Sequence, residues 1–225
     1  MKNKTKEDQL KVYKNLYEKY KGSPMAVSSE SLNHKKLRFN KLSGIFQNEN
    51  NISVHDVGMG LADFGIFLNR NFSEKNIEYS GSDILNDYVD EAKQKFPDSN
   101  FFCRDIAETL PKDKYDFIVL SGVFHQMRSS SIIDWENFSE MILENSFKMC
   151  KKGIAFNMVS PFVDFYQAGI YYSKIEKLIH FINSKLSRFF TINHDYALYE
   201  FTVYIFKEEY IKQKFQEPEF KKYFD

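Results

Sequence analysis

The stretch "HDVGMGLADFG", residues 55–65, decides the fold of this 225-residue chain. It follows the apolar run "ISV" at 52–54 and places glycines at positions 58 and 60, the spacing of a nucleotide-binding turn between a strand and a helix. Glycines let the backbone turn sharply and approach a ligand closely. The stretch therefore predicts a binding turn, followed by a helix that begins near Leu61.

The third glycine of the dinucleotide-binding fingerprint is absent from this turn. Its position, three residues after Gly60, is Asp63, and an acidic side chain at a helix N-terminus repels a pyrophosphate. Asp56, two residues before Gly58, adds negative potential. A nicotinamide cofactor therefore fits poorly. An uncharged or cationic nucleoside fits better, and S-adenosylmethionine is such a ligand, because it carries a sulfonium and an ammonium but no phosphate.

Two further aspartates follow the next two predicted strands. Asp83 ends "IEYSGSD", where a carboxylate can accept both hydroxyls of a ribose. Asp105 ends "NFFCRD", where a carboxylate could face an adenine amino group. The alternative for each aspartate is a loop position or a helix cap. Carboxylates at the ends of three successive strands favour a nucleoside site.

The chain beyond residue 52 alternates β-rich runs with helical patterns. We expect strands at 52–57, 77–83, 100–105, 115–123 and 153–160, with helices at 62–72, 85–96 and 135–150. This order is typical of an open, largely parallel sheet with helices on both faces. After a helix at 172–186, strands at 188–196 and 198–206 leave room only for an antiparallel hairpin. The predicted fold class is α/β, with a Rossmann-like sheet of seven strands and a C-terminal antiparallel hairpin.

Two amphipathic helices precede the predicted sheet. The first is expected at 5–21 and is ended by Gly22 and Pro24, and the second begins near Ser29. The length of the chain suits one sizeable core. We therefore expect a single domain over residues 1–225, in which residues 1–48 form a helical cap on a core at 49–225.

The composition narrows the class of partner. The 31 basic and 31 acidic residues cancel, and neither sign forms a long block, so a small molecule is favoured over nucleic acid or a membrane surface. Cys103 and Cys150 lack metal-type spacing, so we expect no metal site. The N-terminus has no signal-peptide core, and no run of roughly 18 apolar residues occurs. We expect a reduced, cytoplasmic protein, and its oligomeric state stays open.

Three motifs together resemble those of the class I S-adenosylmethionine-dependent methyltransferases. The stretch at 55–65 resembles their glycine-rich motif, "YSGSDI" their ribose motif, and "YDFIVLSGVFHQM" their fourth strand; the closing hairpin is similar to theirs as well. The family usually has cysteine or serine at Met59 and glycine at Ala62, which implies a tighter loop here. The resemblance implies S-adenosylmethionine as cofactor, bound by Asp56, Gly58, Gly60, Leu61, Asp83, Ile84, Asp105, Ile106, Ser121 and Val123.

A narrower resemblance concerns a bacterial subgroup found among polysaccharide-decoration genes. It is carried by "LRFNKL", "GIAFNMVS" and "NHDYALYEFTVYIF", and within the subgroup the chain is similar to methyltransferases that act on the phosphoramidate decoration of bacterial capsule. This resemblance implies a small, polar, anionic acceptor that bears a phosphate or phosphoramidate, in capsule biosynthesis. It also implies that Arg38 meets the carboxylate of the cofactor, whereas a helical arginine alone is more often a solvated charge.

Two histidines are candidates for a catalytic base. Methyl transfer is an in-line displacement that depends mostly on positioning, but a hydroxyl or amide acceptor can also need a proton removed. His125 follows "SGVF" at the end of the fourth strand, and His194 lies beside Asp195 at the turn of the hairpin. A neighbouring carboxylate raises the basicity of an imidazole. The alternative for each is a structural histidine in a loop.

The acceptor site is expected at the same edge of the sheet. Arg128 opens "RSSS", which could hold an anion through charged and hydroxyl hydrogen bonds, or simply cap the next helix. Tyr171, Tyr172 and Tyr199 could form its wall, although packing explains tyrosines equally well. Glu200 lies in the apolar last strand, where burial requires a partner.

The predicted function is methyl transfer, with oxygen favoured over nitrogen as the atom methylated. A small carboxylic acid or a sugar hydroxyl is the alternative acceptor. Readings from other classes are a nicotinamide-dependent oxidoreductase and a non-catalytic subunit that binds S-adenosylmethionine.

Overall fold

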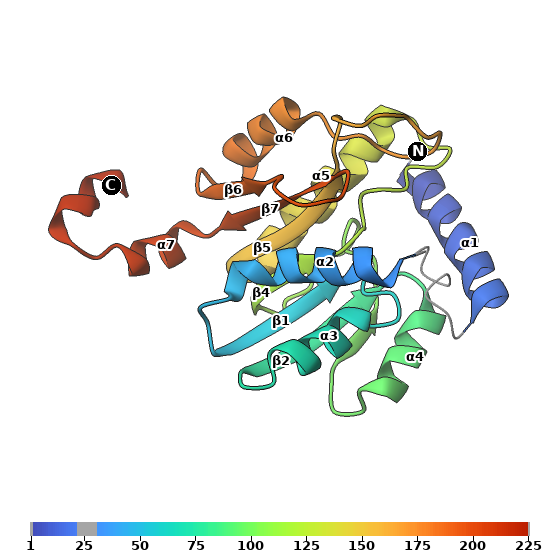
Figure 1. Ribbon diagram of the computed structural model, residues 1–225, viewed down its shortest axis with the longest axis horizontal. Helices are drawn as coiled ribbons and strands as arrows, with labels where there is room; N and C mark the ends of the chain where they lie inside the picture. Colours follow the sequence, from blue (N-terminus) through green and yellow to red (C-terminus); the bar gives the residue numbers. More distant parts are fainter. Residues whose placement is uncertain (1, 22–30, 225) are drawn as a thin grey trace.

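The computed structural model describes residues 2–21 and 31–224 and contains one sheet of seven strands (Figure 1). The strands are β1 (Asn51–Val57), β2 (Asn76–Asp83), β3 (Phe101–Cys103), β4 (Tyr115–Leu120), β5 (Cys150–Val159), β6 (Phe190–Asn193) and β7 (Glu200–Phe206). Their order in the sheet is β3-β2-β1-β4-β5-β7-β6. The first five strands run parallel, and β7 lies antiparallel between β5 and β6. The predicted fold class is confirmed.

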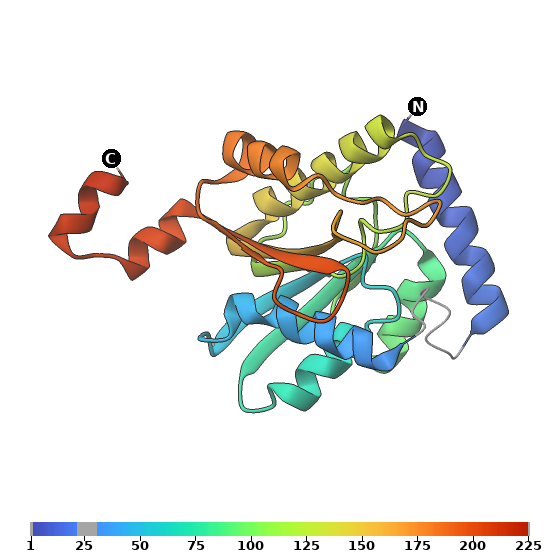
Figure 2. The same ribbon diagram turned by 45° about the horizontal axis from the view of Figure 1, so that its top comes forward.

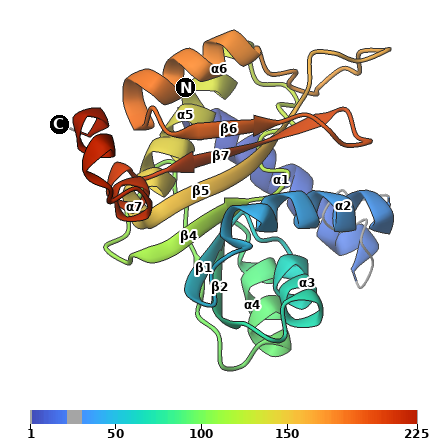
Figure 3. The same cartoon turned by 60° about the vertical axis from the view of Figure 1, so that its left-hand side comes forward.

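Helices cover both faces of the sheet (Figure 3). One face packs against α5 (Ile132–Met149) and α6 (Ile175–Phe181), which continues as the π-helical turn η3 (Ile182–Leu186). The other face packs against α2 (Leu32–Ser43), η2 (Gly44–Phe46), α3 (Asp63–Asn71), α4 (Asn86–Lys95) and α7 (Glu208–Lys214). The central strands are apolar on both faces for this reason.

Alternation along β4 shows how one strand serves both cores. Ile118 and Leu120 belong to the α5 side, whereas Phe117 and Val119 belong to the α2 side, and all four are fully buried. Successive side chains of a strand point to opposite faces, so a strand between two helical layers needs an apolar residue at every position. Burial on both sides fixes the position of the carboxyl end of β4.

The first helix, α1 (Lys2–Tyr20), lies across the end of the sheet at which β1 to β4 finish (Figures 1 and 2). Its Tyr17 ring packs edge-on against Tyr88 of α4, with ring centroids 5.6 Å apart. By contrast, α2 packs within a helical layer, and its N-cap Ser31 accepts a hydrogen bond from the backbone N–H of His34 at 3.3 Å. The two N-terminal helices therefore occupy different places: α1 covers the carboxyl ends of the strands, whereas α2 covers one face of the sheet.

Several boundaries differ from those expected. The strands expected at 115–123 and 188–196 are shorter, because the chain leaves the sheet after Leu120 and pairs with β7 only over Phe190–Asn193. The helix after the glycine turn begins at Asp63. The helix α7 and the 3-10 turn η4 (Pro218–Tyr223) were not expected. The expected helix signals at Gly22, Pro24 and Ser29 lie outside the described residues.

Across 2–21 and 31–224, no helix combines the length and the apolar character that a bilayer span requires.

Candidate functional site

A cavity of about 220 Å³ lies at the carboxyl ends of β1, β2 and β4. Helix α1 contributes Gln9 and Tyr13 to its wall, α2 contributes Arg38 and Phe39, and α5 contributes Trp135 among others. Twelve of the residues predicted to form the site line it: Arg38, Asp56, Gly58, Gly60, Leu61, Asp83, Ile84, Asp105, Ile106, Ser121, Val123 and His125. The fold therefore gathers residues from positions 38 to 125 around one space.

The glycine turn forms the floor of this cavity. Gly58 and Gly60 have φ values of 71° and 53°, and Ala62 has a φ of 59°. A Cβ atom at Gly58 would lie 2.7 Å from Cγ2 of Val123, so a larger residue would collide with the loop after β4. Left-handed backbone favours glycine, and Ala62 adopts it without that advantage. The backbone of the turn therefore lines the cavity at Gly58 and Gly60, where no side chain intervenes.

Asp56 is the most deeply buried of the described acidic residues, with 1% of its surface exposed. Its Oδ2 accepts a hydrogen bond from the Tyr79 hydroxyl at 3.0 Å, and its Oδ1 has no hydrogen-bond partner among the described residues. Burial is the main cause that raises the pKa of Asp56 to about 7, and the nearby charges of Asp83 and Asp63 add to it. The site therefore holds a carboxyl group that a cation entering the cavity would ionise.

Asp83 is held by the backbone on both sides. Its Oδ2 accepts the N–H of Gly60 and its Oδ1 accepts the N–H of Leu85, each at 3.0 Å. Burial raises the pKa of Asp83, although these backbone bonds oppose the rise. Because each carboxylate oxygen has two lone pairs, both can accept a further hydroxyl. The side chain is thus fixed in place before any ligand enters.

The carboxylate of Asp105, which the sequence predicted could face an adenine, has partners within the chain. Its Oδ1 accepts the backbone N–H of Ala107 at 2.8 Å, and Nζ of Lys6 lies 3.2 Å from its Oδ2. Lys6 also donates to Glu108 at 2.9 Å. Helix α1 is therefore tied to the cavity wall through the carboxylate that was expected to face an adenine.

Asp63, at the start of α3, forms an ion pair with Lys35 of α2, with Nζ and Oδ2 2.6 Å apart. The sequence argument against a pyrophosphate treated Asp63 as an uncompensated charge. The structure shows that Lys35 offsets this charge, so repulsion at the helix N-terminus is weaker than expected.

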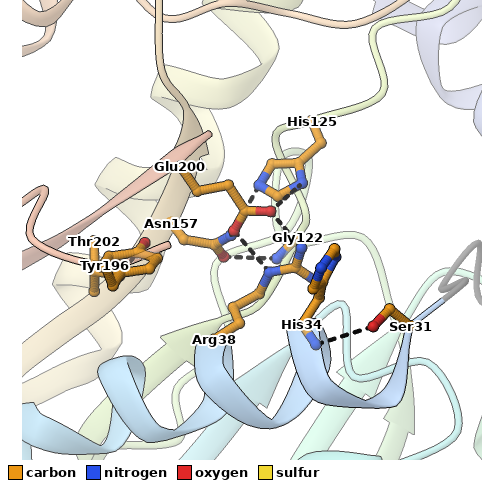
Figure 4. A network of polar contacts seen from close by, with 9 residues as sticks. All are labelled: Ser31, His34, Arg38, Gly122, His125, Asn157, Tyr196, Glu200 and Thr202. Carbon is orange, nitrogen blue, oxygen red and sulfur yellow. Dashed lines mark hydrogen bonds and ion pairs between the residues drawn. The ribbon is translucent and has the colours of Figure 1, made fainter. Parts of the chain in front are cut away.

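A buried polar network lies beside the cavity, between α2, β5 and β7 (Figure 4). Nε of Arg38 donates to Oε2 of Glu200 at 2.8 Å, and Nη2 of Arg38 donates to Oε1. The Asn157 amide donates to Oε2 of Glu200 at 2.6 Å and lies 2.8 Å from Nε2 of His125. Its Oδ1 accepts the backbone N–H of Gly122 at 2.8 Å. Glu200 thus has the partner that its burial requires.

Both charges of this network are shielded from water. Side-chain exposure is 18% for Arg38 and 10% for Glu200. Burial raises the pKa of the Glu200 carboxyl, but its charged and hydrogen-bonding neighbours, Arg38 and Asn157 among them, lower it below the ordinary value. Burial is also the main cause that lowers the pKa of His125 to about 4. At neutral pH the network therefore consists of an ion pair and an uncharged imidazole.

Arg38 was expected to meet the carboxylate of the cofactor, but two of its nitrogens already donate to Glu200. Nε and one Nη point to the carboxylate, so the whole guanidinium does not face the cavity. Nη1 lies on the other side, 3.7 Å from the position that a Cβ would take at Gly122. Nη1 is thus the guanidinium nitrogen that does not donate to Glu200.

Four predicted residues, His194, Arg128, Tyr172 and Tyr199, do not line the cavity. The ring of His194 packs near Phe162 and Phe201, with ring centroids 6.1 and 6.2 Å away. Asp195, the neighbouring carboxylate that could raise the basicity of His194, forms an ion pair with Lys41, with Nζ and Oδ1 2.7 Å apart. His194 therefore stands apart from the gathered residues.

The other three of these residues have contacts outside the cavity. The backbone N–H of Arg128 donates to Gly169, and its Nε is buried without a hydrogen-bond partner in the described part of the chain. The hydroxyl of Tyr172 accepts the backbone N–H of Gln167 at 2.8 Å. The hydroxyl of Tyr199 donates to Asp164, and the side chain is exposed. Tyr171, also weighed as part of the wall, donates to Glu136 on the α5 side instead.

Sequence reasoning missed Gln9, Tyr13, Lys35 and Asn157. Gln9 donates from its side-chain amide to the backbone carbonyl of Gln126 at 2.7 Å, which places α1 directly over the loop after β4. One signal for Asn157 was present, since it is the single polar residue in the middle of the apolar run "GIAFNMVS". A lone amide inside a strand buried on both faces requires partners.

Comparison with known proteins adds to this geometry. No protein-family profile matches the chain. A Mycobacterium tuberculosis protein, Rv1506c, whose name proposes a methyltransferase, is 26% identical over 161 residues, which span 69% of this chain and 93% of the relative.

Two solved structures share the arrangement of most of the chain. Magnesium protoporphyrin IX methyltransferase from Synechocystis PCC 6803, with bound S-adenosylhomocysteine, has a TM-score of 0.63 at 12% identity, covering 92% of this chain and 99% of that one. The N-methyltransferase NodS from Bradyrhizobium japonicum WM9, in complex with S-adenosylhomocysteine, has a TM-score of 0.60 at 12% identity, covering 88% and 96%. Identity this low establishes the fold alone. The chain has the fold of the class I S-adenosylmethionine-dependent methyltransferases.

Proposed function

We propose that the protein is a methyltransferase that uses S-adenosylmethionine. The observation that carries this proposal is the convergence of Asp56, Asp83 and Asp105, from the ends of three successive strands, on one cavity floored by the glycine turn. Ligands of open α/β sheets bind at the carboxyl ends of the strands. Three carboxylates there suit a nucleoside with a positive charge better than one with a pyrophosphate.

The residues present fit this cofactor. Asp56 offers a buried oxygen without a partner, which an ammonium or sulfonium would satisfy. Asp83, fixed by two backbone N–H groups, would accept the ribose hydroxyls. Ile84, Ile106 and Leu61 would pack against the adenine, and the Nη1 edge of Arg38 would meet the methionine carboxylate. When bound, the cofactor supplies a methyl carbon attached to a positively charged sulfur.

The acceptor is proposed to be small, polar and anionic, and methylated on oxygen. One cation supports an anion: Arg128, whose Nε has no hydrogen-bond partner within the described residues. Tyr172 and Tyr199 stand near the same edge of the sheet and would contact an acceptor that extends beyond the cavity. The residues of the chain would bind the acceptor, orient it toward the methyl carbon and exclude water.

The narrower proposal is transfer to a phosphate or phosphoramidate group in capsular polysaccharide biosynthesis, in the cytoplasm. It rests on the resemblance of "LRFNKL", "GIAFNMVS" and "NHDYALYEFTVYIF" to the bacterial subgroup. Small carboxylic acids and sugar hydroxyls remain alternative acceptors. Release of S-adenosylhomocysteine from a panel of sugar phosphates, phosphoramidates, carboxylic acids and sugars distinguishes these groups.

The topology counts against a nicotinamide-dependent oxidoreductase. The dinucleotide-binding sheet has the strand order 3-2-1-4-5-6 in parallel, whereas β7 here runs antiparallel between β5 and β6. A non-catalytic subunit that binds S-adenosylmethionine would share the aspartates but would release no S-adenosylhomocysteine with any acceptor.

Thermal unfolding tests the cofactor. A ligand that binds only the folded chain raises its melting temperature. We expect S-adenosylhomocysteine to raise it and NAD to leave it unchanged. The opposite pattern would show that the proposed cofactor is wrong. The variant Asp98→Ala, which changes an exposed aspartate outside the cavity, should respond as the unmodified protein does.

A further inference from the structure

Asn157 on β5 is fully buried and has three hydrogen-bond partners. One of these partners can only donate a hydrogen bond, and another can only accept one. The backbone N–H of Gly122 is a donor, so it must meet Oδ1 of Asn157, and the carboxylate of Glu200 is an acceptor, so it must meet the Nδ2 group. The orientation of the amide is thereby fixed without reference to the third partner.

The third partner is Nε2 of His125, 2.8 Å from Nδ2 of Asn157 (Figure 4). One Nδ2 hydrogen points to Glu200 and the other points to His125. Since Asn157 donates, Nε2 of His125 must accept and carries no proton. A neutral imidazole then has its proton on Nδ1, which lies 3.8 Å from Oε1 of Glu200. The one ring lone pair of His125 is occupied by the Asn157 amide.

Burial, more than the charges around it, keeps His125 uncharged. Arg38 from α2 and Glu200 from β7 are the charged groups that face it, and they already neutralise each other. Burial is the main cause that lowers the pKa of His125 to about 4, and Arg38 acts in the same direction while Glu200 opposes it. Protonation of Nε2 would set two donors against each other at the Asn157 contact.

We propose that Asn157 is a positioning residue that holds His125 as the neutral Nδ1–H tautomer, so that His125 does not remove a proton from the acceptor. Glu200 takes part as the group that fixes the Asn157 amide. This arrangement replaces the base predicted at His125 with a group whose lone pair is already used.

The consequence for the acceptor rests on the proposed function. An acceptor that reacts without His125 as a base carries its nucleophilic oxygen already ionised, as a carboxylate or a phosphate-type oxygen does at neutral pH. In the transfer, an electron pair of this oxygen forms the bond to the methyl carbon, the bond from that carbon to sulfur breaks, and its pair stays on sulfur. The oxygen loses its negative charge, the sulfur loses its positive charge, and no proton moves.

Nitrogen NMR of the histidine rings tests the tautomer directly. The full chain is labelled with ¹⁵N, and His125→Gln assigns the His125 signals among the five histidines. We expect the Nδ1–H form in at least about fivefold excess from about pH 6 to about pH 9, because one buried hydrogen bond shifts an equilibrium by roughly that factor. A ring protonated on Nε2, or one that titrates within this range, would overturn the proposal.

Two variants separate positioning from packing. Asn157→Ala removes the donor, so the excess of the Nδ1–H tautomer should disappear. Asn157→Asp replaces the donor with an acceptor and should favour a proton on Nε2. As a control, Asn71→Ala removes an amide that donates to the Phe67 carbonyl of its own helix and should leave His125 unchanged. If neither Asn157 variant folds, the tautomer of the unmodified protein still decides the question.

The same samples distinguish failure of this proposal from failure of the proposed function. The tautomer is measured without any ligand, and binding of S-adenosylhomocysteine is measured separately by calorimetry. An Nδ1–H ring without cofactor binding would leave the tautomer proposal standing and refute the methyltransferase. Cofactor binding with an Nε2–H ring would do the reverse.

Discussion

The guanidinium of Arg38 on α2 and the carboxylate of Glu200 on β7 form a bidentate ion pair across 162 positions of sequence. Two parallel N–H···O bonds match the planar fork of an arginine to a carboxylate. The pair joins a helix that precedes the sheet to the last strand that enters it. Arg38 also lines the cavity, and its Nη1 does not donate to Glu200.

Glu200→Gln tests the energetic weight of this pair. Removing one charge of a buried pair leaves the other without compensation, so we expect the free energy of unfolding to fall by about 3 kcal/mol. The value lies at the lower end of the usual range because the Arg38 side chain remains 18% exposed. Urea denaturation measures it. Glu144→Gln, which breaks a surface pair with Lys148 in α5, should cost about 0.5 kcal/mol or less; equal losses would contradict the assignment.

Asp56→Asn should stabilise the protein at neutral pH. Asp56 has a pKa of about 7 in the folded chain, chiefly because of burial, against an ordinary value of 3.8. Between these values the unfolded chain releases a proton that the folded chain keeps, so the free energy of unfolding falls as the pH rises. The cost is on the order of 4 kcal/mol above about pH 7, because each unit of pKa difference corresponds to about 1.4 kcal/mol. The asparagine variant does not have this cost.

Urea denaturation at several pH values measures the difference between Asp56→Asn and the unmodified protein. The gain in stability should grow as the pH rises from 3.8 toward about 7 and then stay constant. Affinity for S-adenosylhomocysteine should fall in the same variant, because its ammonium loses the carboxylate. A gain that is independent of pH would contradict the ionisation of Asp56.

Asp83→Ala should weaken binding of S-adenosylhomocysteine by about 1.5 to 3 kcal/mol, the usual size for hydrogen bonds to a charged group. Isothermal titration calorimetry measures this loss. Because Asp83 also holds the N–H groups of Gly60 and Leu85, Asp83→Asn serves as the milder variant. An unchanged dissociation constant in both folded variants would assign Asp83 to the support of the loop alone.

Gly58→Ala should destabilise the turn for two separable reasons. Its φ of 71° costs a residue with a side chain roughly 1 to 2 kcal/mol, and its Cβ would lie 2.7 Å from Val123. The double variant Gly58→Ala with Val123→Ala removes the collision and keeps the backbone cost. In thermal unfolding, we expect Gly58→Ala to lower the melting temperature less in a chain that carries Val123→Ala than in the unmodified chain. Equal losses would mean that Val123 moves aside freely.

Local sequence features were enough to predict the architecture of the sheet. Runs of apolar residues long enough for strands buried on both faces, such as the one that contains β4, alternate with helical patterns. The short link before β7 requires an antiparallel pair, and the structure has one. The glycines at 58 and 60 marked the turn, and their φ values explain why that residue type is needed there.

Contacts between distant segments could not be predicted in this way. Nothing near Arg38 in the sequence indicates that Glu200 will be its partner, and nothing near Asp63 indicates Lys35. The position of α1 over the cavity depends on pairs such as Lys6 with Asp105, about one hundred residues apart. His194 and Asp195 are neighbours in sequence, yet their side chains have different partners, because each takes the contact that the packed hairpin offers.

The insertion of β7 between β5 and β6 has a consequence for how the chain is made. A ribosome releases Arg38 long before Glu200, so the guanidinium has no carboxylate partner while most of the chain is synthesised. Strand β6 emerges before β7 but pairs only with β7 within the sheet, and the edge of β5 stays open until β7 arrives. An open edge of this kind can pair with another chain. The wall that contains Asn157 and Glu200 is therefore completed only after residue 200 has left the ribosome.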